Sequence, residues 1–263
     1  MSIKCIERVI VATPSVDEAR DRWSQGGFAV SATDREVDGI RFARLAAGAI
    51  EIDLAEAKKT ARGPLAEAVV QAASRGGGIV GWTWGTEDGD AQAQAKVQLP
   101  GFKSELQSSV ISAGLPGVFT AALQVTSGLE VRNELYRKEF GGNPNTVDFL
   151  EHIVVMTPAL EDAIAAQEAI GVPCKRIREV GNGMRQAFFK LEQTVIEVVG
   201  PARDRPGCWG LAFMCSDIAK AVATARAKGL QATEPKKAIQ GGLIARIVDP
   251  LDGVAIAFMQ AAS

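Results

Sequence analysis

The chain has 263 residues, of which 47% are hydrophobic and 23% are charged, a composition typical of a globular protein with one large domain or two of ordinary size. Its formal net charge of −2 gives no electrostatic reason to expect nucleic acid or an anionic membrane as a partner. The partner is therefore expected to be a small molecule or another protein.

The first predicted element is a strand, CIERVIVATP, which ends at Pro14. A helix follows it and ends near Gly27. The segments REVDGIR (35–41) and AIEID (49–53) are predicted to be further strands. Together these elements form one βαβββ module.

The rest of the first half is less regular. Residues 58–77 are predicted to be a linker or a packing helix inside this half. A second module opens with GWTWGTED at Gly81 and continues into an Ala-rich stretch of helical period. The sequence does not define the strand boundaries between residues 100 and 147, and residues 132–148 are expected to cross between the halves.

The second half repeats this order. Its first strand, FLEHIVVMTP, ends at Pro158 and contains His152, the only histidine of the chain. TPALEDAIAAQEAIG predicts a helix with acidic residues near its start, where the helix dipole favours them, and a turn at Gly171. Short strands follow. GLAFMCSD and SDIAKAVATARAKG then open a last module that closes with DGVAIAFMQ.

The two halves are related by an internal repeat. Three matched pairs are each 144 positions apart: Arg8 with His152, Pro14 with Pro158, and Gly27 with Gly171. After small length changes in the loops, Glu51 corresponds to Glu197. We therefore predict an N-terminal domain over residues 1–135 and a C-terminal domain over residues 148–263.

Paired modules with the segments EHIVVMTPALEDA, VIEVVGPA, WGLAFMCSDI and DPLDGVAIAF resemble the vicinal oxygen chelate superfamily. Its members include glyoxalase I, extradiol dioxygenases, methylmalonyl-CoA epimerase and the bleomycin- and fosfomycin-resistance proteins. The resemblance implies an α+β fold, with four βαβββ modules paired into two glyoxalase-like cupped mixed sheets and the helices packed outside. It is more specific for the fold than for the reaction.

The resemblance also implies a divalent metal in the cup, held by residues of the first and last strands of the modules. In the second half these positions fall on His152, Glu197, Gly210 and Ala257. Glycine and alanine offer no ligand side chain, which argues against an extradiol dioxygenase. The expected cofactor is therefore either none or one divalent metal held by His152 and Glu197, with Asp217 and Glu192 as further residues to consider. In the first half the positions fall on Arg8, Glu51 and Gly81, and the fourth cannot be placed.

Strand alternation points His152 and Glu197 to one face each, so the two side chains can meet in the cup. A buried imidazole beside a carboxylate is suited to general acid/base work. We therefore predict an enzyme that acts on a small carbonyl-containing metabolite by proton transfer, as a lyase, an isomerase or an epimerase. Two alternatives stay open: the pair is a structural remnant, as is expected for Arg8 with Glu51, or the protein binds and sequesters a small molecule without chemistry.

Three further residues are candidates for substrate binding. Arg185 and Gln186 are adjacent on one strand and should point to opposite faces, and Gln186 is the better candidate because its counterpart in the first half is Phe42. Trp209 precedes the strand that opens the last module and could form an aromatic wall.

Other classes of site and location are constrained by missing motifs. The Gly-rich pieces lack the patterns of a nucleotide site. The four cysteines have no metal-ligand spacing, no apolar run reaches the roughly 18 residues of a membrane span, and no secretory signal is visible. We therefore expect a soluble cytoplasmic protein with no membrane partner, present as a monomer or a homodimer.

Overall fold

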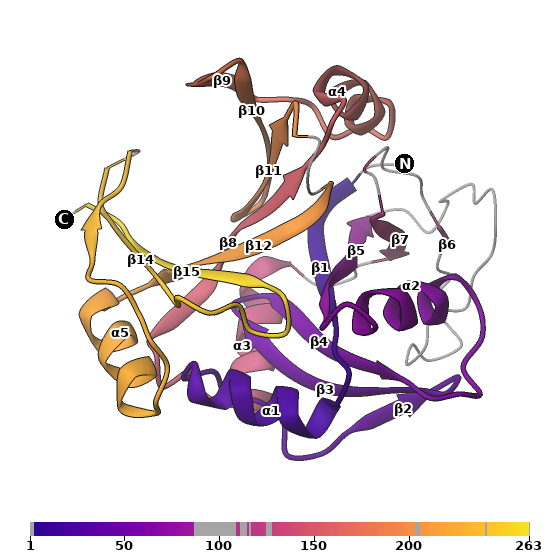
Figure 1. The fold of residues 1–263 in the computed structure, drawn as a ribbon, viewed down its shortest axis with the longest axis vertical. Helices are drawn as coiled ribbons and strands as arrows, with labels where there is room; N and C mark the ends of the chain where they lie inside the picture. The colour runs from indigo at the N-terminus through magenta and orange to yellow at the C-terminus, as the bar shows by residue number, and fades with distance from the viewer. Residues whose placement is uncertain are drawn as a thin grey trace.

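The computed structural model describes residues 3–86, 109–110, 115, 117–124, 128–202, 206–239 and 241–262. These residues form two curled mixed sheets and five helices (Figure 1). The predicted α+β class with two cupped sheets is therefore confirmed. The Ala-rich stretch that follows Asp88 lies outside the described residues.

The first sheet has seven strands in the order β2-β3-β4-β1-β5-β7-β6. Its strands are β1 (Ile3–Ala12), β2 (Arg35–Val37), β3 (Ile40–Ala47), β4 (Ile50–Ala57), β5 (Gly78–Thr86), β6 (Ser109–Val110) and β7 (Phe119–Gln124). The helices of this half are α1 (Val16–Gln25) and α2 (Pro64–Ala73), and α3 (Leu129–Phe140) leads to the second half. The segment 58–77 thus contains a packing helix, as predicted.

The second sheet has eight strands in the order β13-β14-β15-β12-β8-β11-β10-β9. Its strands are β8 (Val147–Met156), β9 (Arg176–Gly181), β10 (Met184–Leu191), β11 (Thr194–Gly200), β12 (Gly207–Cys215), β13 (Lys236–Lys237), β14 (Leu243–Arg246) and β15 (Ala255–Gln260). The helices are α4 (Leu160–Ala169) and α5 (Ile218–Ala227). Figure 1 shows both helices outside the curve of the sheet.

Local chemistry explains where the helices begin and end. The side chains of Ser15 and Asp217 accept hydrogen bonds from backbone N–H groups in the first turns of α1 and α5. Gly27 and Gly171, which follow α1 and α4, have φ values of +81° and +87°, in the left-handed region that glycine adopts most easily. No helix among the described residues has the length and apolarity needed to cross a membrane.

The pairing of the strands repeats between the halves. Strand β1 runs parallel to β4 and antiparallel to β5, and β8 runs parallel to β11 and antiparallel to β12. Arg8 is in register with Glu51, whereas His152 is in register with Val195, two residues before Glu197. The repeat read from the sequence is therefore present in the sheets.

A shared apolar core joins the halves. In the first half the ring of Trp23 packs on Phe28, with centroids 5.3 Å apart, and Phe28 packs in turn on Phe213 of the second half, with centroids 4.9 Å apart. All three side chains are buried. The apolar cluster around them includes residues of both sheets, so the two halves bury each other's surface.

Asp252 provides a polar link across the same junction. Its side chain is fully buried in the turn before β15. It accepts hydrogen bonds from three groups of the first half: Thr13 Oγ1 at 2.8 Å, Arg22 Nη2 at 2.5 Å and Trp23 Nε1 at 3.0 Å. Because a carboxylate buried in this way needs several donors, Asp252 requires the first half to be in place.

Replacing Asp252 tests this link. We expect Asp252→Ala to lower the free energy of unfolding by about 3 kcal/mol, because it removes the carboxylate that accepts from three donors at the junction. Asp252→Asn, which keeps an acceptor and tolerates the φ of +46° at this position, should cost less. Urea unfolding measures both variants beside Asp249→Ala, which removes an exposed carboxylate from the same turn. Equal stability of the Asp252 and Asp249 variants would contradict the assignment.

Candidate functional site

The candidate site lies on the concave face of the second sheet, the face that α4 and α5 do not cover (Figure 1). The register of the strands defines its residues, because side chains in register share one face. We call this set the second cup: Arg176, Arg178, Gln186, Phe188, Lys190, Val195, Glu197, Val199, His152, Val154, Met156, Ala212, Gly210, Ala257 and Ala255. His152 and Glu197 therefore lie on one face of the sheet, which is the condition on which the predicted dyad depends.

His152 is buried, with 5% of its surface exposed. Its Nδ1 atom contacts Oε2 of Glu151, the residue before it in the chain. The ring also lies edge-on to Phe188, with centroids 6.4 Å apart. None of the described residues forms a hydrogen bond with Nε2, so the second ring nitrogen is the one available to a ligand.

A β-bulge explains how Glu151 and His152 come together. In regular alternation, adjacent residues point to opposite faces. Leu150 pairs with Phe213 and His152 pairs with Ala212, so Glu151 is an extra residue on β8. The first half has the same feature: Ile6 pairs with Trp84 and Arg8 with Thr83, which leaves Glu7 as the extra residue. The bulge thus belongs to the repeat.

Burial sets the charge state of the imidazole. Desolvation, together with the positive charge of Lys190, lowers the pKa of His152 to about 4. The ring is therefore neutral near pH 7. A neutral imidazole with its proton on Nδ1, the atom in contact with the Glu151 carboxylate, keeps an Nε2 lone pair that can accept a proton.

Glu197 is held by a different partner. Gln186 Nε2 donates to Glu197 Oε1 at 2.6 Å, so this amide positions the carboxylate. Burial raises the pKa of Glu197, and the charge of Arg178 opposes that effect. The structure thus gives the two side chains separate partners: His152 contacts Glu151, and Glu197 accepts a hydrogen bond from Gln186. The predicted dyad is a pair of neighbours on one face, roughly 7–8 Å apart at their Cβ atoms by sheet geometry.

Arg185 and Gln186 point to opposite faces, as predicted. Arg185 forms an ion pair with Glu161 of α4 on the outer face, so it is outside the second cup. Trp209 lies at a register irregularity of β12, and half of its surface is exposed. An exposed aromatic ring beside Gly210 is available to a ligand.

The residues of the second cup do not fit a catalytic metal. Gly210 has no room for a side chain, because an added Cβ would lie 2.6 Å from the carbonyl oxygen of Ala255. Ala257 supplies no donor atom. Asp217 caps α5, and Glu192 pairs with Arg132 at 2.6 Å, so neither completes the set. Among the described residues no group of three or more His, Cys, Asp or Glu side chains is arranged to hold a metal ion.

The corresponding face of the first sheet is filled. Helix α2 packs on it with Leu65, Val69 and Ala72, against Ile10 and Phe42. Beside them Arg8 Nη1 contacts Glu51 Oε1 at 2.8 Å and Asp53 Oδ2 at 2.6 Å. Burial and the neighbouring Asp53 raise the pKa of Glu51 to about 7. Arg35 and Arg44 complete this buried network, so the interpretation of Arg8 with Glu51 as a buried ion pair is supported by their contacts.

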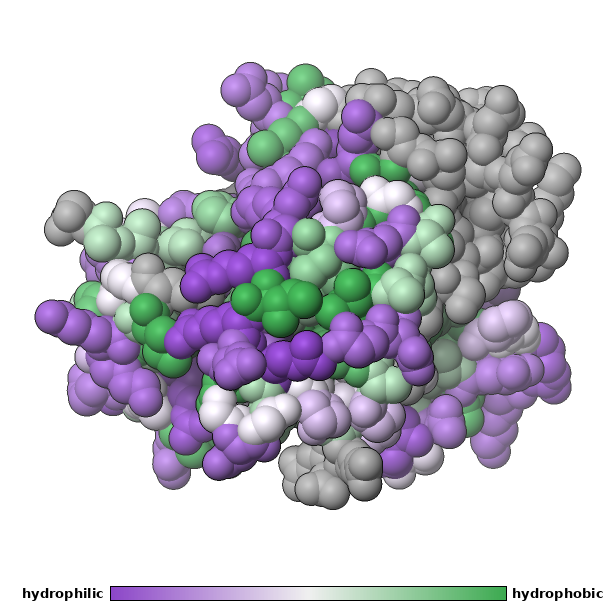
Figure 2. All heavy atoms as spheres, turned by 90° about the horizontal axis from the view of Figure 1, so that it is seen from above, coloured by the Kyte–Doolittle hydropathy of each residue, from purple (hydrophilic) through white to green (hydrophobic). Residues whose placement is uncertain are grey.

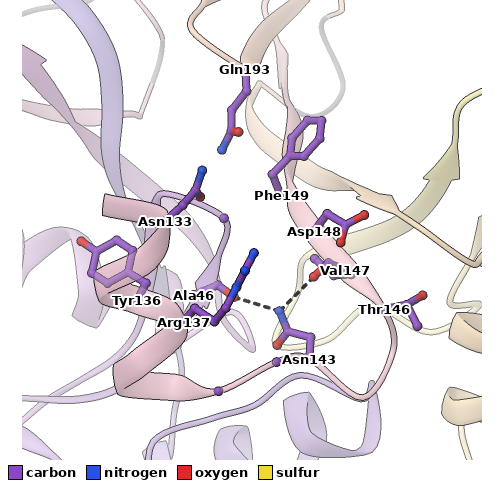
Figure 3. Close-up of a pocket in the computed structure, with 13 residues that line it drawn as sticks. Ala46, Asn133, Tyr136, Arg137, Asn143, Thr146, Val147, Asp148, Phe149 and Gln193 are labelled. Carbon is purple, nitrogen blue, oxygen red and sulfur yellow. Dashed lines mark hydrogen bonds between the residues drawn. The ribbon is translucent and has the colours of Figure 1, made fainter. Parts of the chain in front are cut away.

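A cavity of about 420 Å³ lies elsewhere, between α3 and the start of β8 (Figure 3). Its lining includes Asn133, Arg137, Phe149 and Gln193. Asn143 fixes its floor, since Nδ2 donates to the carbonyl oxygens of Ala46 at 3.1 Å and Val147 at 3.4 Å. Neither His152 nor Glu197 lines this cavity. It is a junction between the halves rather than the acid/base site.

Comparison with known proteins defines the fold. No protein-family model and no curated protein matches the chain. Among solved structures, a mutant of 4-hydroxymandelate synthase from Streptomyces coelicolor matches with a TM-score of 0.68 at 14% identity, over 100% of this chain and 95% of that one. A xylose isomerase-like TIM barrel/4-hydroxyphenylpyruvate dioxygenase fusion protein matches with a TM-score of 0.66 at 13% identity, over 98% of this chain and 49% of that one.

These likenesses cover both halves of the chain in one alignment. The chain therefore has the vicinal oxygen chelate fold in its tandem form, which is the fold of these enzymes and confirms the resemblance seen in the sequence. The chain spans about half the length of the fusion protein. At such low identity the likeness fixes the fold, and the chemistry has to be argued from the residues of the second cup.

The single histidine allows a direct test of the Glu151 contact. In a chain labelled with ¹⁵N-histidine, NMR should show one imidazole with its proton on Nδ1, and Glu151→Ala should give a mixture of tautomers. Glu161→Ala, which removes an exposed carboxylate from α4, should leave the signal unchanged. A ring protonated on Nε2 in the unsubstituted chain would contradict the contact.

The same sample gives the pH dependence. Because the pKa of His152 in the folded chain, about 4, lies below its ordinary value of 6.5, the unfolded chain binds the proton more readily. Stability should be independent of this group above pH 6.5 and should fall as the pH is lowered from 6.5 to 4. The ring signals should report a neutral imidazole down to about pH 5. Titration near pH 6.5 would contradict the assigned burial.

The first half offers a contrasting test. Arg8→Met should destabilise the chain by about 3 kcal/mol or more, because it leaves Glu51 and Asp53 buried with fewer cations. The Arg8→Met molecules that remain folded should bind a ligand of the second cup as the unsubstituted chain does. Thermal unfolding compares Arg8→Met with Arg185→Met, which removes an outer ion pair. An unchanged melting temperature would contradict a structural role for Arg8.

Proposed function

We propose that the protein is an enzyme that transfers a proton at a carbon next to a carbonyl group in a small metabolite. The observation that carries this proposal is the pairing of a neutral, oriented imidazole at His152 with a carboxylate of raised pKa at Glu197, on one face of the second cup. Groups with proton affinities shifted in this way are typical of acid/base sites.

The roles follow from the contacts. His152 Nε2 accepts the proton from carbon, while Glu151 holds the ring in the tautomer that leaves Nε2 free. Glu197, positioned by Gln186, returns a proton to a second atom of the substrate. His152 and Glu197 are diagonal neighbours on adjacent strands, so one small substrate could reach both groups. This geometry supports isomerase or lyase chemistry, in which a proton leaves one position and returns at another.

Site-directed variants test the proposal. The assay follows by ¹H NMR the incorporation of deuterium from D₂O into a panel of small 2-oxo acids and ketones. It detects removal of a proton from carbon even when the product is not known. His152→Ala and Glu197→Gln should each reduce exchange roughly 10²- to 10⁴-fold, the usual contribution of a general base or acid. Arg185→Gln is the control, because its side chain lies on the outer face of the same sheet. Exchange that persists in His152→Ala with the fold intact would overturn the proposal.

A binding protein of the same fold is the alternative. Half-buried apolar residues of the second cup, Val154, Met156 and Phe188, favour it because they could hold a ligand without chemistry. In that case no substrate would exchange deuterium, and a ligand of the cup would bind equally well to His152→Ala.

A further inference from the structure

The second cup has a cationic edge that the proposed proton transfer does not use. Arg178 is in register with Gln186 and Arg176 with Phe188, so both arginines of β9 face the cup. Lys190 is in register with Val195, next to His152. Three positive charges thus follow one side of the face that carries the acid and the base.

The two arginines are not committed to acidic partners. Among the described residues neither guanidinium forms an ion pair or a hydrogen bond, in contrast with Arg185, which pairs with Glu161 on the outer face. Lys190 Nζ donates to the backbone carbonyl of Gln193 at 2.7 Å. A neutral carbonyl leaves its charge uncompensated.

Their fields act on the two candidate catalytic groups. The charge of Arg178 acts on Glu197, and the charge of Lys190 acts on His152. The strand register brings the same groups together, since Arg178 is one strand from Gln186, the partner of Glu197, and Lys190 is in register with Val195, which is in register with His152. A ligand in contact with His152 and Glu197 is therefore within reach of the cationic edge.

Apolar surface accompanies the charges. Phe188 and Val154 are in register with Glu197, Met156 follows on the same face of β8, and all three are half-buried. On the molecular face at the top of Figure 1, hydrophobic residues gather near the middle, with hydrophilic residues above and below them (Figure 2). A ligand with an apolar body and an anionic end matches this distribution.

We propose that the second cup selects carboxylate-bearing substrates, with Arg178 and Arg176 as the residues that bind the carboxylate. A guanidinium offers parallel N–H donors that match the two oxygens of a carboxylate. Arg178, which is the less exposed of the two, makes the principal contact, and Arg176 and Lys190 add charge at the edge. This inference rests on the proposed function, because it names the substrate class of the same site.

Edge protection is the competing explanation. β9 is the last strand of its sheet, and charged side chains on such strands prevent pairing with other chains. That role requires charge at the edge but no selectivity for a ligand, so binding measurements separate the two explanations.

Calorimetric titration with pyruvate and benzoate, each beside its uncharged methyl ester, is the test. Both acids should bind the unsubstituted chain more tightly than their esters, and Arg178→Gln should weaken binding of the acids roughly 10- to 100-fold while leaving the esters unchanged. Arg176→Gln should have a smaller effect in the same direction. Arg185→Gln, the same change on the outer face, is the matched control.

Several results would overturn the inference: no saturable binding of either acid, equal binding of acids and esters, or acid binding that survives Arg178→Gln. Equal losses in Arg178→Gln and Arg185→Gln would assign the effect to net charge and would also overturn it. In His152→Ala, the acids should still bind. Failure of the proton-transfer proposal therefore shows as exchange that does not depend on His152, whereas failure of this inference shows in binding alone.

Discussion

Strand β8 is the constraint on which the candidate site depends, because it is hydrogen-bonded along both edges, to β11 and to β12. Pairing on both edges fixes which face each side chain takes, and a shift of one residue would move His152 into the core beneath α4. The bulge at Glu151 acts inside this fixed frame. It places an acidic side chain against His152 without changing the register of β11, so the position of Glu197 is preserved.

The two halves share a repeat, but the concave faces of their sheets carry different side chains. In the first half the face that corresponds to the second cup holds Arg8, Glu51 and Asp53, and α2 covers the rest with apolar side chains. Buried charges of this kind persist only when each has a partner, and here Arg8 is the partner of both Glu51 and Asp53. In the second half no helix of the described residues packs on the concave face. The first half is thus a scaffold, joined to the second through Asp252 and the aromatic core.

The sequence predicted the features that follow from periodic patterns. Matched positions 144 residues apart revealed the repeat, and alternation indicated that His152 and Glu197 could meet in the cup and that Arg185 and Gln186 point to opposite faces. The sequence did not predict the contacts that depend on an exception to strand alternation or on residues far apart in the chain. Regular alternation would turn Glu151 away from His152, although the repeated Glu at position 7 was a signal that this residue matters. The hydrogen bond between Gln186 and Glu197 joins neighbouring strands through a side-chain conformation that no sequence pattern encodes.

The electrostatics of the second cup would connect the proposed carboxylate binding to the proposed proton transfer. Burial and Lys190 keep His152 neutral, and this is a poor environment for the imidazolium that forms when it accepts a proton. An anion beside Lys190 and Arg178 would cancel part of that unfavourable field, so the proton affinity of His152 would rise only while the ligand is bound. The same anion would remove the field by which Arg178 favours ionised Glu197, which would then hold its proton more firmly. A carboxylate-bearing substrate would thereby raise the proton affinity of His152, the proposed base, and keep Glu197, the proposed acid, protonated.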